Sequence, residues 1–359
     1  MMQCGLVGLP NVGKSTLFNA LTESSLAQAE NYPFCTIDPN VACVCVPDIR
    51  LSSLANAAQS KEIISSQIQF VDIAGLVKGA SEGEGLGNQF LAHIRQVDVI
   101  VHVVRAFSDE GITHVHGSID PLLDIDVIET ELLLSDLQSA ERQLSKKHKG
   151  GDNRETTKAL LERGVRYLQN GIPLHTVSWS SEEYYQLSKL GFLTAKPVIY
   201  LINISEKDML NNTVPYQKKI LERTHGRPVV WMSTKIEAEV VQLSLEDRIL
   251  FLKDLNIHCT GLERIIREVY DAMGLISFFT VGPKETRAWT VKKHAKAPEA
   301  AGCIHSDFER GFIRAEVIFW EDYVTYKGEL GAKSAGRMST EGKDYIVRDG
   351  DVILFRFNV

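Results

Sequence analysis

The sequence lacks the features expected of a secreted protein or a membrane protein. Its six cysteines are scattered without a C-x-x-C pair, so the sequence indicates neither a zinc site nor a disulfide framework. No apolar run reaches the roughly 18 residues that a membrane span needs. The N-terminus enters a predicted strand at once, without a charged and apolar leader. We therefore expect a cytoplasmic protein that binds no membrane.

An excess of positive charge is also missing. The formal net charge is -7, which argues against a protein that coats nucleic acid with its whole surface, because such binding neutralises phosphates. The net charge does not exclude local basic patches. Internal repeats and low-complexity tracts are absent, and 359 residues exceed what one hydrophobic core usually supports. The chain is therefore expected to form two or three globular domains.

A phosphate-binding motif stands near the N-terminus. Residues 8–15 read GLPNVGKS, a full G-x-x-x-x-G-K-[ST] loop between an apolar run and a predicted helix. In such a loop backbone N–H groups surround the phosphates, Lys14 neutralises the β and γ oxygens, and Ser15 offers a hydroxyl to Mg²⁺. Because both flanks fit, a glycine-rich turn with a surface lysine is disfavoured, and we predict a nucleotide hydrolase. The predicted contacts from this loop are Asn11, Val12, Gly13, Lys14, Ser15 and Thr16.

Short apolar runs alternate with helical or loop stretches over much of the chain. This alternation predicts an α/β fold, a doubly wound and mainly parallel sheet covered by helices on both faces. The six predicted strands are residues 3–7, 41–46, 68–73, 97–104, 197–203 and 228–232.

The stretch between the fourth and fifth of these strands is much longer than an ordinary βα connection, which indicates an insertion. Apolar residues at helical spacing predict two inserted antiparallel helices, and Ser180 with Glu183 forms a capping box for a third. From Phe278 onward, short strands and glycines predict a small β-rich domain. The expected domains are the nucleotide-binding domain at 1–125 and 197–275, the helical insertion at 126–196 and the β-rich domain at 276–359.

Two segments match the switches of nucleotide hydrolases. Asp72 to Gly75 reads D-x-x-G, in which the aspartate holds Mg²⁺ through water and the glycine N–H senses the γ-phosphate. Upstream, Thr36 is either a second hydroxyl for Mg²⁺ or an ordinary loop threonine, and the residues alone leave both open. The predicted metal ligands are Ser15, Thr36 and Asp72.

Leu76 occupies the position where many switch hydrolases carry a water-orienting glutamine. Leucine cannot orient water, so the polar help comes from elsewhere: from Lys14, from Mg²⁺, from a monovalent cation such as K⁺ near Asn11, or from a loop side chain. His114 and His116 lie in such a loop, and they could equally be solvated histidines. His114 and Lys14 are the predicted catalytic residues.

The segment after the fifth strand bears on base selection. Asn203 stands where guanine-specific switches begin N-K-x-D, but Ile204 replaces the lysine and Glu206 the aspartate. Because that aspartate accepts two hydrogen bonds from guanine, the geometry for guanine is spoiled and we predict ATP. Ser233 and Thr234, after the sixth strand, are expected beside the base.

These motifs, with residues 31–40 (NYPFCTIDPN) and the block 297–316, make the chain similar to the Obg-like ATPase family, called YchF in bacteria, over essentially its whole length. The resemblance implies a TRAFAC-class P-loop domain, a coiled-coil-like helical arm, a C-terminal TGS domain, a preference for ATP and association with the ribosome. It also implies a role for His114 rather than His116, and marks Leu76 as the family's hydrophobic replacement for glutamine. The remaining roles that it implies are phosphate and magnesium binding for Lys14 and Ser15, switching for Thr36 and Asp72, and base binding for Asn203 and Glu206.

Two basic clusters could contact ribosomal RNA, or could simply be solvated faces. They are Lys146, Lys147 and Lys149 at the end of the first inserted helix, and Lys292 and Lys293 in the β-rich domain. Two classes of function follow. The first is a regulatory ATPase whose nucleotide state alters its affinity for the large subunit or the whole ribosome. The second is a nucleotide-stabilised binding protein with negligible hydrolysis, and a GTPase of the same fold is a further alternative.

Overall fold

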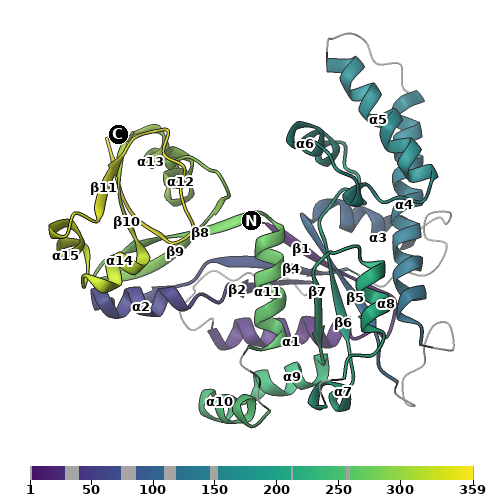
Figure 1. Ribbon diagram of the computed structural model, residues 1–359, viewed down its shortest axis with the longest axis horizontal. Coiled ribbons are helices and arrows are strands. Elements are labelled where there is room, and N and C mark those ends of the chain that lie inside the picture. Colours follow the sequence, from purple (N-terminus) through teal and green to yellow (C-terminus); the bar gives the residue numbers. More distant parts are fainter. Residues whose placement is uncertain are drawn as a thin grey trace. The chain divides into compact units, whose positions relative to one another are not determined.

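The computed structural model describes residues 2–28, 40–73, 86–108, 119–145, 153–211, 213–255, 257 and 259–358 (Figure 1). The chain divides into two compact units, and each is described by itself. The nucleotide unit comprises Met1–Ala27, Thr36–Ala42 and Gln69–Val269, and the C-terminal unit comprises Gln28–Cys35, Cys43–Ile68 and Tyr270–Val359. No helix among the described residues is long and apolar enough to cross a membrane.

The six predicted strands all join one sheet, which confirms the predicted fold class. Its order is β2-β4-β1-β5-β6-β7, and β1 pairs in parallel with β4 and β5, as does β6 with β5 and β7. Because parallel strands end at one edge of a sheet, the residues after β1, β4, β6 and β7 gather at that edge. The strands are β1 Gln3–Val7, β2 Val41–Cys45, β4 Gln67–Asp72, β5 Val99–Arg105, β6 Val198–Asn203 and β7 Val229–Met232.

Helices follow most of these strands in sequence (Figure 1). They are α1 Lys14–Gln28, α3 Leu86–Gln96, α7 Glu206–Leu210, α8 Gln217–Arg223, α9 Thr234–Gln242, α10 Leu245–Asp254 and α11 Gly261–Ala272.

The predicted helical insertion contains α4 Pro121–Ser145, α5 Asn153–Gln169, a short 3-10 turn at Leu174–Thr176 and α6 Ser181–Lys189. Helices α4 and α5 pack together, and the capping box predicted at Ser180 and Glu183 is formed at the start of α6. The buried carboxylate of Asp136 in α4 accepts hydrogen bonds from the backbone N–H groups of Leu193 and Thr194 at 2.8 and 2.7 Å. These bonds hold the end of the insertion against α4.

The C-terminal unit is built on a second sheet of order β11-β10-β12-β8-β9-β3. Apolar cores cover both of its faces, one beneath α12 and α13 and the other beneath α2 and α14. Its strands are β3 Glu62–Ile64, β8 Leu275–Val281, β9 Glu285–Lys292, β10 Phe312–Phe319, β11 Met338–Glu341 and β12 Asp351–Phe357. Its helices are α2 Ile49–Ala58, α12 Ala297–Ile304, α13 Ser306–Arg310, α14 Trp320–Thr325 and α15 Glu329–Ser334.

One segment groups differently from the sequence expectation. Residues 43–68, expected within the continuous stretch 1–125, belong to the C-terminal unit. Strand β3 pairs in parallel with β9, and Leu51 and Leu54 of α2 join the core that contains Phe279. The physical reason is the apolar stripe of α2, which must be buried against another element, and the sequence does not show which one.

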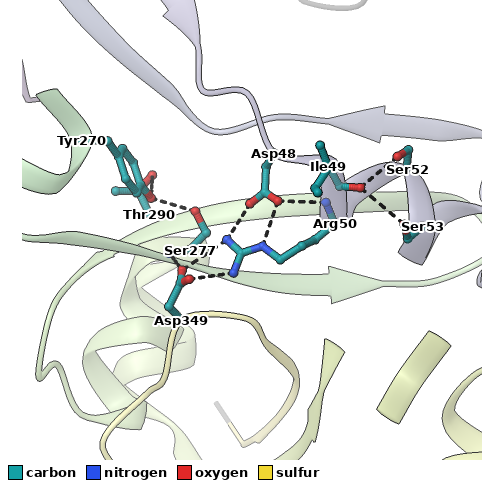
Figure 2. Close-up of polar contacts among 9 residues, drawn as sticks. All are labelled: Asp48, Ile49, Arg50, Ser52, Ser53, Tyr270, Ser277, Thr290 and Asp349. Atoms are coloured by element: carbon teal, nitrogen blue, oxygen red, sulfur yellow. Dashed lines mark hydrogen bonds and ion pairs between the residues drawn. The ribbon is translucent and has the colours of Figure 1, made fainter. Parts of the chain in front are cut away.

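An arginine secures this packing. Figure 2 shows the Arg50 guanidinium between two carboxylates, with Nη2 2.7 Å from Asp48 Oδ2 and Nη1 2.7 Å from Asp349 Oδ2. Asp349 in turn accepts a hydrogen bond from the Ser277 N–H at 2.9 Å. The guanidinium also lies over the Phe279 ring, 5.1 Å from its centroid. The ion pair therefore joins α2 to the loop before β12 and to β8.

Candidate nucleotide site

The glycines of the predicted phosphate loop occupy places where a larger residue would collide. A Cβ at Gly8 would lie 2.5 Å from the carbonyl oxygen of Val103 in β5, and one at Gly13 would lie 2.3 Å from Asn203 Nδ2. Gly13 has φ of 102° and Asn11 has φ of 63°. These left-handed residues turn the backbone back on itself just before α1 begins at Lys14, which is the conformation that presents N–H groups to an anion.

Asn203, at the end of β6, connects this loop to the loop after β7. Its side-chain Nδ2 donates to the Val12 carbonyl at 3.0 Å, and its Oδ1 accepts from the Thr234 N–H at 3.0 Å. The residue is buried. A buried amide with both ends satisfied holds its partners firmly, so the phosphate loop and the predicted base loop form one rigid rim.

Beside this rim, the charges of buried Lys14 and partly buried Asp72 oppose each other. Burial lowers the pKa of Lys14, against the opposing charge of Asp72, and burial raises the pKa of Asp72, against the opposing charge of Lys14. Burial thus disfavours the charged form of each side chain. An arriving phosphate would favour charged Lys14, and an arriving cation would favour ionised Asp72.

The residues present fit Mg²⁺. Asp72 Oδ1 is buried and accepts no hydrogen bond from the described part of the chain, so an oxygen ligand for a hard cation stands ready. Ser15 is exposed in the first turn of α1. No group of three or more His, Cys, Asp or Glu side chains forms a ready-made metal cluster in the described ranges. Mg²⁺ sites take one or two protein oxygens together with substrate phosphates, and Asp72 and Ser15 would supply such oxygens.

The residues predicted to contact the base follow β6 and β7, within this rim and next to it. Ile204 is buried and its N–H donates to the Met232 carbonyl at 3.0 Å, whereas Glu206 opens α7, whose cap is Ser205. The Glu206 carboxylate pairs with Lys235 Nζ at 3.0 Å. Glu206 is therefore anchored across the two loops that follow β6 and β7, with its side chain 40% exposed. Ser233 and Thr234 are buried at the start of α9.

Three features near the site were not predicted from the sequence. Lys235, the partner of Glu206, is one. Arg105 is another: it is fully buried at the end of β5, its Nε donates to the Phe107 carbonyl at 3.1 Å, and its guanidinium lies 4.5 Å from the Phe107 ring centroid. The third is Glu237 of α9, whose carboxylate accepts the N–H of Gly261 at 2.6 Å. The available signal for Arg105 was an arginine ending the strand VIVHVVR, in which His102 is the one other polar residue.

Other predicted residues lie outside the described part of the chain. They are Thr36, Leu76, His114, His116, Lys146, Lys147 and Lys149. Lys292 and Lys293 are described and exposed at the end of β9, and Lys292 Nζ donates to the Met273 carbonyl at 2.9 Å.

Two protein families match separate stretches of the sequence. Residues 3–134 match a family described as "50S ribosome-binding GTPase", and residues 275–358 match the YchF-GTPase_C family, described as a protein of unknown function. Relatives that match over their full length show which family the whole chain belongs to. Curated proteins named "Ribosome-binding ATPase YchF" are 51% identical in Haemophilus influenzae, with 99% of each chain covered, and 47% identical in Bacillus subtilis, with all of each chain covered.

The chain belongs to the YchF family. A solved structure, that of the Schizosaccharomyces pombe YchF GTPase, is 40% identical and superposes with a TM-score of 0.89 over 99% of this chain and 97% of that one. Membership confirms the resemblance inferred from the motifs. The P-loop and the C-terminal sheet are therefore those of a YchF protein.

Proposed function

We propose that this YchF protein is a Mg²⁺-dependent ATPase that associates with the ribosome and changes its affinity for the ribosome with its nucleotide state. The observation that carries the proposal is the rim in which Asn203 joins the P-loop to the base loop, beside buried Lys14 and partly buried Asp72. Relatives covering the full chain are named ribosome-binding ATPases, which supports the same function.

The base preference rests on Glu206. The printed names of relatives differ here, since the curated bacterial proteins are called ATPases and the solved fission yeast protein a GTPase. In this chain Lys235 holds the Glu206 carboxylate. That carboxylate lies one carbon further from the backbone than the carboxylate of an aspartate would. An aspartate in N-K-x-D accepts two hydrogen bonds from guanine, and neither that residue nor its lysine companion is present. We therefore assign ATP.

The chain's own residues account for binding and charge stabilisation. Lys14 neutralises the β and γ oxygens, the N-terminus of α1 contributes its dipole, and Ser15 and Asp72, with Thr36, would hold the metal. Mg²⁺ held there would neutralise the negative charge that develops on the phosphate oxygens. His114 is proposed to orient the attacking water in place of Leu76, with K⁺ near Asn11 as a further source of positive charge.

The test is ATP turnover and ribosome co-sedimentation in ATP, ADP and no nucleotide. Wild type should hydrolyse ATP and sediment differently in the three states. Lys14→Ala should lower nucleotide affinity or turnover at least tenfold, because phosphate neutralisation is lost. If the wild-type protein binds nucleotide but its ATP turnover is near zero with and without ribosomes, the nucleotide-stabilised binding protein is favoured instead. Cross-linking to ribosomal RNA, with Lys292 and Lys293 changed to Gln, checks the proposed contact there.

A further inference from the structure

The central strands of the C-terminal sheet separate part-way along their length. Strands β8 and β12 run in parallel, but they are bridged at a single register position, Val352 opposite Phe279. Both strands continue past it, β8 to Val281 and β12 to Phe357. Each remains paired on its other side, β8 with β9 and β12 with β10. The sheet is therefore split between two strands that are neighbours in its order.

A cavity of about 200 Å³ occupies this split. Thr280 and Val281 of β8 line it, as do Val352 to Phe355 of β12. In the register set by Val352 and Phe279, Ile353 and Leu354 would pair with Thr280 and Val281 had the strands stayed together. Residues from both cores of the sheet also line it, Phe308 from the α13 side and Tyr323 from the α14 side. Strands that diverge leave unpaired N–H and C=O groups along their facing edges, which can template a further strand.

The side chains that line the cavity define what it can accept. Its walls include the aromatic rings of Trp289, Phe308 and Tyr323, and Trp289 is fixed by a hydrogen bond from Nε1 to Thr280 Oγ1 at 2.9 Å. Three carboxylates, Glu285, Glu316 and Glu329, line it, whereas no described lysine, arginine or histidine does.

Only one of these carboxylates has its charge balanced within the described ranges. Glu316 is paired with Arg356 at 2.9 Å and with Arg314 at 3.3 Å. Glu285 and Glu329 form no ion pair in the part of the chain that the structure describes. A cationic ligand would therefore meet the uncompensated negative charge of Glu285 and Glu329. The aromatic rings contribute less, because the Arg287 guanidinium already lies 4.2 Å from the Trp289 ring centroid and the Phe308 ring stacks on Phe357 at 3.8 Å between centroids.

We propose that this split in the sheet, named here the β8–β12 cleft, binds an extended peptide segment that carries lysine or arginine. The peptide backbone adds to the open edge of β12, and its basic side chains reach Glu285 and Glu329. RNA is disfavoured as the occupant, because its phosphates would face the same carboxylates. The inference does not depend on nucleotide hydrolysis.

The probe is a capped synthetic hexapeptide of alternating arginine and valine, titrated calorimetrically into the full-length protein. Two matched peptides accompany it: one with glutamate in place of arginine, and one with alternate backbone nitrogens methylated, which removes N–H donors and keeps the charge. The test variant is Glu285→Lys with Glu329→Lys. The control is Glu321→Lys with Asp344→Lys, which makes the same change of charge on exposed residues of the same unit that do not line the cleft.

The proposal expects saturable one-to-one binding of the arginine peptide, at least tenfold weaker in the Glu285 and Glu329 variant and within twofold of wild type in the control. Both matched peptides should also bind at least tenfold more weakly. Equal losses in the test and control variants would reduce the effect to net charge and overturn the site. So would undisturbed binding of the methylated peptide, binding of an oligouridylate at the cleft, or no binding of the arginine peptide. Thermal melts of each variant confirm that it folds.

Discussion

The side-chain amide of Asn203 donates to the Val12 carbonyl while its oxygen accepts from the N–H of Thr234, each at 3.0 Å. One buried side chain thus fixes the distance between the phosphate loop and the base loop. We therefore expect nucleotide affinity and the stability of the nucleotide unit to depend on the same residue.

Asn203→Ala should lower both quantities. The change leaves a buried carbonyl and a buried N–H without partners, at a cost of about 1–3 kcal/mol each. We expect the free energy of unfolding to fall by about 2 kcal/mol or more, and ATP to bind at least tenfold more weakly. Urea unfolding and calorimetric titration measure the two effects. Asn170→Ala, on an exposed residue, should stay within about 0.5 kcal/mol of wild type.

Rebuilding N-K-x-D should shift base preference. Glu206→Asp with Ile204→Lys restores the guanine-accepting carboxylate, and GTP affinity should rise relative to ATP by about 1–3 kcal/mol, the scale of a recovered polar pair in a desolvated site. Competition between the two nucleotides at equal concentration measures the shift. Lys207→Gln, an exposed neighbour, is the control. An unaltered preference in the double variant would place base selection elsewhere.

His114→Ala tests whether this histidine orients the attacking water in place of the missing glutamine. If the imidazole orients water, its loss lowers ATP turnover by about ten- to a thousandfold while nucleotide affinity stays within about twofold, because the group acts only on the transition state. His116→Ala should be nearly silent. Wild-type turnover in His114→Ala, with and without ribosomes, would leave the P-loop and the metal ions as the source of catalysis.

His102 should make the protein sensitive to acid. Burial lowers its pKa from 6.5 to about 4, so the unfolded chain binds a proton between these values and the folded chain does not. Stability contributed by this residue is complete above pH 6.5 and is lost as pH falls, by about 2 kcal/mol between pH 7 and pH 5. In His102→Leu the pH dependence of urea unfolding should be smaller by that amount.

His93 provides the matched control, because it is exposed on α3. His93→Leu should keep the wild-type pH dependence. Equal slopes of stability against pH in wild type and His102→Leu would show that His102 takes up its proton as readily in the folded protein as in the unfolded one.

Arg50→Ala should destabilise the C-terminal unit. The arginine is one-fifth exposed and pairs with two carboxylates, and removing one partner of such a pair costs about 2–4 kcal/mol. Arg50→Lys should recover only part of the loss, because an ammonium lacks the planar fork that reaches both aspartates. Asp344→Ala, which breaks an exposed pair with Lys296, should cost less than about 1 kcal/mol. Denaturant unfolding followed by near-UV circular dichroism measures all three.

The sequence predicted the parts of the fold and the site that depend on local patterns. The strands of the nucleotide sheet are mostly apolar runs, the pattern from Gly8 to Ser15 specifies the loop that it forms, and Ser180 with Glu183 caps the helix that follows. What it could not show depends on partners distant in the chain. The apolar stripe of α2 does not show that Phe279 will cover it. Nor does the sequence around Lys235 show that this lysine pairs with Glu206.

Helix α2 and the loop before β12 are synthesised at very different times. Arg50 and Asp349 are 299 positions apart in the chain, and an N-terminal segment leaves the ribosome first. The apolar stripe of α2 therefore stays exposed to solvent until nearly the whole protein has been translated. A chaperone that binds exposed apolar segments during synthesis would meet Leu51 and Leu54 before their partners in the core are made.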